Sequence, residues 1–283
     1  MLQLVQTLGF PFLACIIMGS ILGLLGVHVL KREVIFVDIA LAQVAAVGAI
    51  AGHLAFEAHH DSLLSYACSL TAVFVVAVFY AVARKFIIQI SLEAVIGITY
   101  AVAAATALFL VGIAPGGHIH VQEILSGSLL WTDCRDVILA LLVFSTVGFC
   151  FYLVRKPLNS ISNNYYLVLD RGVRLVFWDI VFYLLLGIVI TLSVQMGGIV
   201  VVFAYLIIPA TISAIYTSTP AVHLVIILTT TGLASVSGLL FAYYLDFSIG
   251  PMIALMLGGE LVIAAIFGRF FQNYRRDINF QLK

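Results

Sequence analysis

Charged residues are scarce in this chain. Asp, Glu, Lys and Arg make up 9% of its 283 residues, whereas hydrophobic residues make up 64%. Because a soluble domain usually has about a quarter of its residues charged, this composition excludes an ordinary soluble protein. The formal net charge is zero, and we expect a lipid bilayer rather than a nucleic acid around the chain.

The sequence also lacks the short motifs of the common redox, metal and ATP-hydrolysing sites. Its four cysteines stand singly, without a Cys-x-x-Cys pair, which argues against a redox centre or a thiolate metal site. It has neither a G-x-x-x-x-G-K-[ST] phosphate loop nor a His-Glu-x-x-His motif. The chain therefore cannot hydrolyse ATP through a phosphate loop, and we expect no enzyme activity and no cofactor in this chain.

Long apolar runs are what the sequence has in abundance. A bilayer core needs about 20 apolar residues per helix, so the polar breaks predict an all-α, polytopic membrane domain over residues 1–283. The first run has no basic segment before it, so we expect it to be a span and not a cleavable signal peptide. Nine spans are predicted, at residues 8–30, 37–56, 63–83, 92–113, 136–154, 176–195, 198–216, 221–244 and 251–268.

One feature of the sequence leaves the number of spans open, and another predicts the orientation of the chain in the membrane. The glycine break at Gly197 and Gly198 is compatible with a tight turn or with a broken helix, which would give eight spans and a re-entrant segment. Twelve of the 13 basic residues, all but Arg135, lie on one side of the membrane in the nine-span arrangement. The positive-inside rule then predicts an external N-terminus and a cytoplasmic C-terminus.

The longest predicted cytoplasmic loop, residues 155–179, is the expected docking surface for a soluble partner. Within it, Tyr165, Leu169 and Val173 recur at four-residue spacing, which predicts a short amphipathic helix over Tyr165–Arg174. Such a helix suits contact with a partner protein, and its alternative is a helix on the lipid surface. The candidate contact residues are Tyr165, Leu169, Asp170, Gly172 and Arg174.

Polar residues inside the spans are candidates for a transport pathway. Asp38 lies at the cytoplasmic end of the second span, where it could serve the pathway, pair with Lys31 or Arg32, or cap the helix. Gln43 is displaced from it by about 140° around a helix. Glu260 lies near mid-bilayer, where a carboxylate is either functional or a protonated or snorkelling residue at a helix contact.

The external side carries the best metal candidates. His118, His120 and Glu123 lie within six residues, and imidazole with carboxylate suits zinc, manganese or iron. His59 and His60 form a second external group, for which simple solvation is the favoured interpretation. We therefore expect a metal entrance near His118, His120 and Glu123.

Pairs of glycines at four-residue spacing predict close helix packing. Gly19 and Gly23 form such a pair in the first span, and Gly48 and Gly52 form another in the second. Small residues at this spacing let membrane helices approach each other, although apolar helices are also simply rich in glycine.

Several ordered stretches resemble the permease subunit of the metal-type ABC importers for zinc, manganese or iron. WDIVFYLLLGIVITLSVQMGGIVVVFAYLIIPATISAIY at 178–216 is similar to that family's "SVxxVGVLLVxALLVIPAA" stretch. GVHVLKREVIFVDIALAQVAAVGAIAG at 26–52, LEAVIGITYAVAAA at 92–105 and HIHVQEILSGSLLW at 118–131 agree in order and spacing. LDFSIGP at 245–251 resembles the family's "LDLPSGP" turn.

The resemblance implies a type II importer fold in the cytoplasmic membrane of a prokaryote. It implies a cytoplasmic ABC ATPase that binds the ATP, a periplasmic or extracellular metal-binding protein, a second permease copy and a transported divalent metal, with zinc the first expectation. The family's second span carries "SDALSHAVLPG"; here Ile39 and Gln43 stand at its Asp and His positions, and Asp38 comes one residue early. The implied pathway ligands are therefore altered in this chain.

Two other classes of protein remain open from the sequence. The nearest approach to a serine protease motif, Ser235-Val-Ser237-Gly238, lacks the preceding glycine, which disfavours an intramembrane enzyme. A stand-alone secondary transporter would need more intramembrane charges than Asp38 and Glu260 and would not need the 155–179 loop.

Overall fold

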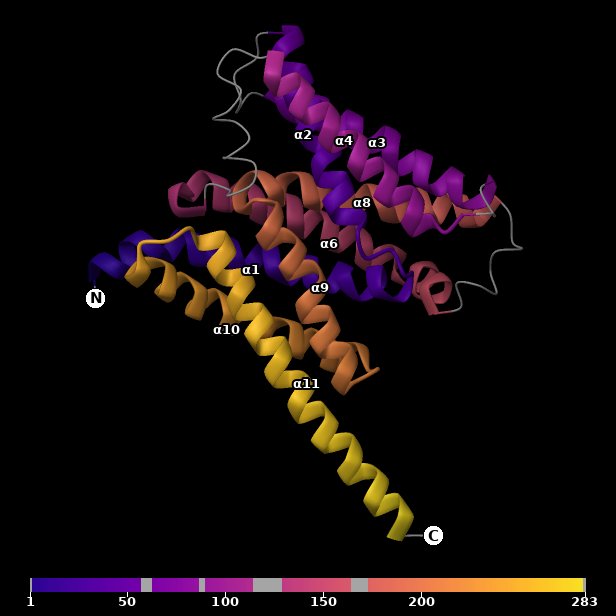
Figure 1. Cartoon of the computed structure of the whole chain (residues 1–283), viewed down its shortest axis with the longest axis vertical. Helices are drawn as coiled ribbons and strands as arrows, with labels where there is room; N and C mark the ends of the chain where they lie inside the picture. Colours follow the sequence, from indigo (N-terminus) through magenta and orange to yellow (C-terminus); the bar gives the residue numbers. More distant parts are fainter. Residues whose placement is uncertain (1, 57–62, 87–89, 114–128, 164–172, 282–283) are drawn as a thin grey trace.

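The computed structural model describes residues 2–56, 63–86, 90–113, 129–163 and 173–281. In these residues the chain is helical and has no strand, as the all-α expectation requires. The helices, shown in Figure 1, are α1 (Leu2–Lys31), α2 (Val37–Phe56), α3 (Leu63–Phe86), α4 (Leu92–Ile113), the short 3₁₀ helix η1 (Leu129–Trp131), α6 (Cys134–Asn163), α8 (Val173–Gly197), α9 (Ile199–Tyr216), α10 (Pro220–Leu245) and α11 (Ile249–Gln281).

The prediction of nine membrane spans is confirmed for the part of the chain that the structure describes. Nine of its helices are long and apolar enough to cross a bilayer, each with a span of 18 to 26 residues. Large apolar side chains on α4 and α6, such as Leu108, Phe109 and Leu142, are more than half exposed. Exposed apolar side chains on helices of this length are suited to lipid tails rather than to water.

The glycine break between the sixth and seventh spans is a tight turn. α8 ends at Gly197 and α9 begins at Ile199, so Gly198 alone joins two membrane-length helices. Gly198 has φ 79°, a conformation that is costly for residues with a Cβ. The re-entrant alternative is therefore not needed to explain this break.

The helices on either side of the predicted loop 155–179 are longer than the sequence indicated. α6 continues to Asn163, and α8 begins at Val173, so only residues 164–172 of that stretch lie outside the described residues. Hydropathy marks where the bilayer ends, and a helix can extend beyond that point into water because its hydrogen bonds are internal. Arg174 accordingly lies in the first turn of α8.

The helices pack in two neighbouring groups, which are joined by α8. α2 packs on α3 and α4, and α3 packs on α8; α1 packs on α9, α10 and α6, and α9 packs on α11. Figure 1 shows α2, α3 and α4 side by side, with α11 running away from the other group towards the C-terminus. α8 contacts α1, α2, α3, α6 and α9, so it joins the two groups.

One end of this bundle, which we call the basic end, is where α1, α3 and α6 end and α2, α4, α8 and α10 begin. Hydrogen bonds join these helix ends: Arg32, directly after α1, bonds to side chains of α6 and α8. The side chain of Glu93 on α4 bonds to the backbone of Phe36, directly before α2. The basic residues at or near it include Lys31, Arg32, Arg84, Arg155 and Lys156.

The predicted close packing at the paired glycines is confirmed. A Cβ placed on Gly23 would lie 2.5 Å from Ile227 Cγ2, and one on Gly48 would lie 2.8 Å from the Cys68 carbonyl oxygen. Gly19 and Gly52 are similarly crowded, by Thr231 and Cys68. These glycines therefore let α1 approach α10 and let α2 approach α3.

Candidate functional site

The beginnings of α2 and α4 meet at the basic end through Glu93. Its Oε1 accepts a hydrogen bond from the Phe36 backbone N–H at 3.1 Å. The first N–H groups of a helix lack partners within that helix, and a carboxylate from α4 supplies one at the start of α2. Glu93 lies in the first turn of its own helix α4 and thus also acts on a neighbouring helix.

Asp38 is a buried carboxylate at the same place. It is 1% exposed, and its Oδ1 accepts a hydrogen bond from the Ile39 N–H at 2.8 Å. Its Oδ2 is buried and has no hydrogen-bond partner among the described residues. Since an unsatisfied buried acceptor is costly, this oxygen is suited to receive a proton or a cation.

Gln43 and Glu260 are each half-buried. Gln43 follows Asp38 along α2, whereas Glu260 lies within the span Ile249–Gly268 of α11. Glu260 Oε2 is buried without a hydrogen-bond partner among the described residues. A Cβ on Gly258 or Gly259 would meet nothing within 4 Å, so these glycines do not pack α11 closely against the described part of the chain.

Arg32 at the basic end is bonded to side chains of two other helices. Its Nη1–H donates to Asp179 Oδ1 at 2.6 Å, and the two side chains are 0% and 1% exposed. Its guanidinium carbon also lies 4.0 Å from the centre of the Phe182 ring, within the range of a cation–π interaction. The suggested partnership of Arg32 with Asp38 is therefore replaced by one with Asp179.

Ser162 connects this ion pair to the end of α6. Its Oγ accepts a hydrogen bond from Arg32 Nε–H at 3.2 Å and lies 3.2 Å from His28 Nδ1. The His28 ring packs edge-on against Phe151, with 4.9 Å between ring centres. We call Arg32, Asp179, Ser162 and His28 the polar joint of α1, α6 and α8.

The sequence did not predict the polar joint. Asp179 was assigned to the edge of a loop, and Arg32 was used as one of the basic residues that set the orientation. A signal was present: Asp179 lies near the start of an apolar run of more than 15 residues. The cost of a carboxylate in a bilayer, which singled out Glu260, applies to Asp179 as well.

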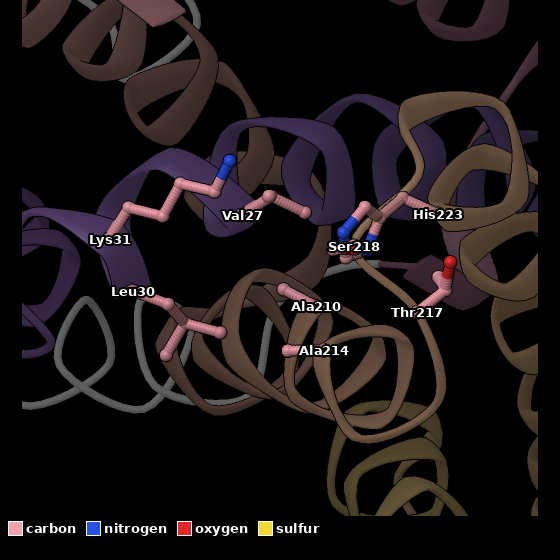
Figure 2. Close-up of a pocket in the computed structure, with 8 residues that line it drawn as sticks. All are labelled: Val27, Leu30, Lys31, Ala210, Ala214, Thr217, Ser218 and His223. Carbon is pink, nitrogen blue, oxygen red and sulfur yellow. The ribbon is translucent and has the colours of Figure 1, made fainter. Parts of the chain in front are cut away.

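A cavity of about 260 Å³ opens at the basic end between α1, α9 and α10 (Figure 2). Figure 2 shows the His223 ring beside Ser218, with Ala210 and Ala214 presented by α9. Its described lining residues are Val27, Leu30, Lys31, Ala210, Ala214, Thr217, Ser218 and His223. Because this lining has a lysine and no carboxylate, the cavity is unsuited to a metal cation.

Several predicted site residues lie outside the described residues. They are His59 and His60, the metal candidates His118, His120 and Glu123, and the contact candidates Tyr165, Leu169, Asp170 and Gly172. Among the residues that the structure does describe, no three His, Cys, Asp or Glu side chains are grouped closely enough to hold a metal ion. The entrance and the coupling contact therefore remain predictions.

The chain is similar to known membrane proteins along nearly its whole length. The model of the ABC 3 transport family matches residues 5–268. The solved structure of "PsaBC from Streptococcus pneumoniae in complex with Fab" has a TM-score of 0.75, covering 93% of this chain and 94% of the other at 20% identity. That likeness shows a shared fold.

Two curated relatives match over parts of their length. A "Probable metal transport system membrane protein" of Chlamydia trachomatis is 22% identical, over 63% of this chain and 61% of the relative. The "Manganese import system permease protein ScaB" of Streptococcus parasanguinis is 28% identical, over 58% of each. The chain spans about three fifths of the length of the curated relatives it matches. Since the family model includes all nine spans, the chain belongs to the ABC 3 transport family of membrane permeases.

Proposed function

We propose that this chain is the permease subunit of an ATP-driven importer of a divalent transition metal in the cytoplasmic membrane of a prokaryote. The family match over residues 5–268 is the observation that carries the proposal. The metal is suggested by the names of the relatives, one of which is a manganese permease. A cytoplasmic ATPase, an external metal-binding protein and a second permease copy complete the proposed assembly.

Zinc and manganese are the two leading cargoes, for different reasons. The sequence HIHVQE at 118–123 offers imidazoles, which suit zinc. The relative ScaB is named for manganese, a metal that suits carboxylate oxygens. We propose that cargo enters near His118, His120 and Glu123, passes near Asp38, Gln43 and Glu260, and is driven by ATPase contact with residues Tyr165, Leu169, Asp170, Gly172 and Arg174.

Uptake of zinc, manganese and iron into proteoliposomes tests this function. The vesicles contain the chain with its ATPase, and each metal is presented by the cognate binding protein. We expect ATP-dependent uptake of at least one metal, and roughly tenfold less uptake in a His120→Ala/Glu123→Ala variant, the scale on which loss of metal-binding groups acts. His59→Ala/His60→Ala is the matched control and should retain uptake.

Other results would count against parts of this proposal. Uptake that proceeds without the ATPase would indicate a stand-alone transporter. If no metal moves and the chain does not alter ATP turnover, the importer assignment is wrong. Equal losses in the two histidine variants would remove the entrance site while leaving the permease function intact.

The partnerless oxygen of Asp38 leads to a second prediction. Asp38→Asn removes the negative charge while keeping the side-chain shape, so metal uptake should fall by roughly tenfold. Glu93→Gln is the matched control, because its amide oxygen still accepts the Phe36 N–H and the start of α2 is preserved. Uptake by vesicles at equal protein content measures both. Unchanged uptake in Asp38→Asn would show that this carboxylate is structural.

A further inference from the structure

The polar joint holds three helix ends in one fixed arrangement. Arg32 follows α1 directly, Asp179 lies in the second turn of α8, and Ser162 is the penultimate residue of α6. Arg32 hydrogen-bonds to both of the others. α6 and α8 are therefore tied to the end of α1 at a single guanidinium.

These two helices flank the segment proposed to meet the ATPase. The chain leaves α6 at Asn163 and enters α8 at Val173, so α6 and α8 are the two helices covalently joined to residues 164–172. A displacement that a partner imposes on this segment therefore acts directly on these two helices. At the polar joint both of them are hydrogen-bonded to Arg32, directly after α1.

The joint is rigid for identifiable reasons. A guanidinium presents its donors in a fixed plane, and Arg32 uses two separate nitrogens, Nη1 and Nε, on Asp179 and Ser162. The Phe182 ring covers its face. With the ion pair almost fully buried, water cannot replace these contacts at low cost.

A short hydrogen-bonded turn continues from Arg32 to the start of α2. Glu33 has φ 55°, Val34 N–H bonds to Val29 O, and Val37 N–H bonds to Val34 O, each at 3.3 Å. Val34 and Val37 are 1% and 0% exposed. Asp38, with its partnerless oxygen, comes next in the chain, so the movement of Arg32 reaches it without a flexible linker.

We propose that Arg32, held by Asp179 and Ser162, is a positioning residue that passes movement of α6 and α8 to α2 during transport. The proposal rests on the function proposed above, because it needs an ATPase that acts on residues 164–172. If Arg32 has this role, the amount of metal moved per ATP hydrolysed depends on the polar joint. This effect is separate from the contribution of the joint to stability.

Two buried serine–histidine pairs give a matched comparison. Ser162 lies beside His28 in the joint, whereas Ser213 Oγ, near the end of α9, lies 2.8 Å from His223 Nδ1 of α10. In Ser162→Ala we expect metal moved per ATP hydrolysed to fall at least roughly fivefold, the lower range for coupling between sites. Ser213→Ala should keep the wild-type amount of metal moved per ATP hydrolysed, even if its melting temperature falls as much as that of Ser162→Ala.

Asp179→Asn provides a second variant, because asparagine keeps the shape and an acceptor oxygen while losing the charge. A lower ratio of uptake to hydrolysis in both joint variants, with normal ATPase binding, supports the proposal. A wild-type ratio in Ser162→Ala, or an equal fall in Ser213→Ala, would overturn it. Failure of the wild-type complex to move metal at all would instead reject the proposed function, so the two failures are distinguishable.

Discussion

Gly26→Ala is expected to destabilise the folded chain by about 3 kcal/mol, the upper range for overpacking a core. A Cβ on Gly26 would overlap the Leu206 carbonyl oxygen and lie 3.1 Å from Ala210 Cβ. The first obstacle is backbone, which cannot rotate away as a side chain can. α1 packs extensively on α9, so the two helices would have to separate along their shared face.

Thermal unfolding of the purified protein in detergent measures this effect, and Gly112→Ala is its control. Gly112 lies in α4 and a Cβ there would meet nothing within 4 Å. Because alanine favours a helix over glycine by up to about 1 kcal/mol, the control should be neutral or slightly more stable. Opposite signs for the two substitutions are the expected result, and equal melting temperatures would contradict the close approach of α1 to α9.

Asp179→Ala is expected to cost about 3–5 kcal/mol, the loss seen when one partner of a buried ion pair is removed. The substitution leaves the Arg32 guanidinium 0% exposed and without the carboxylate that now neutralises it, while its hydrogen bond to Ser162 Oγ is retained. Denaturation in detergent should show a much lower midpoint.

The Arg32→Met/Asp179→Ala pair separates loss of the ion pair from loss of packing. If the buried charge causes most of the damage, the double variant should be more stable than the sum of the single effects predicts. Strict additivity would mean that Arg32 and Asp179 stabilise the fold independently. A loss below about 1 kcal/mol in Asp179→Ala would show that the carboxylate matters little, as for an exposed ion pair.

The positions of the spans were predictable because the bilayer imposes a length and a composition on each helix separately. The predicted span 37–56 coincides with α2, and 92–113 coincides with α4. The ends of α6 and α8 were not predictable in this way, because hydropathy does not detect helical turns that continue beyond the apolar span. The extent of the loop between them was overestimated as a result.

The candidate site was predicted only in part. Asp38 and Glu260 were found because an intramembrane carboxylate is costly wherever it lies. What each carboxylate contacts was not found, since the Arg32–Asp179 pair joins residues 147 positions apart. Likewise, no local pattern indicated that Glu93 bonds to the backbone of Phe36.

By itself, the sequence established a membrane protein of eight or nine spans and its resemblance to a permease family, and it predicted an orientation. Each of these depends on local composition or on the order of motifs along the chain. Only the tertiary structure decided which charged residues pair, which glycines pack against the backbone of a neighbouring helix and how α1, α6 and α8 are joined. These properties depend on the distance between residues far apart in sequence, and burial then makes each contact energetically decisive because water cannot substitute for a missing partner.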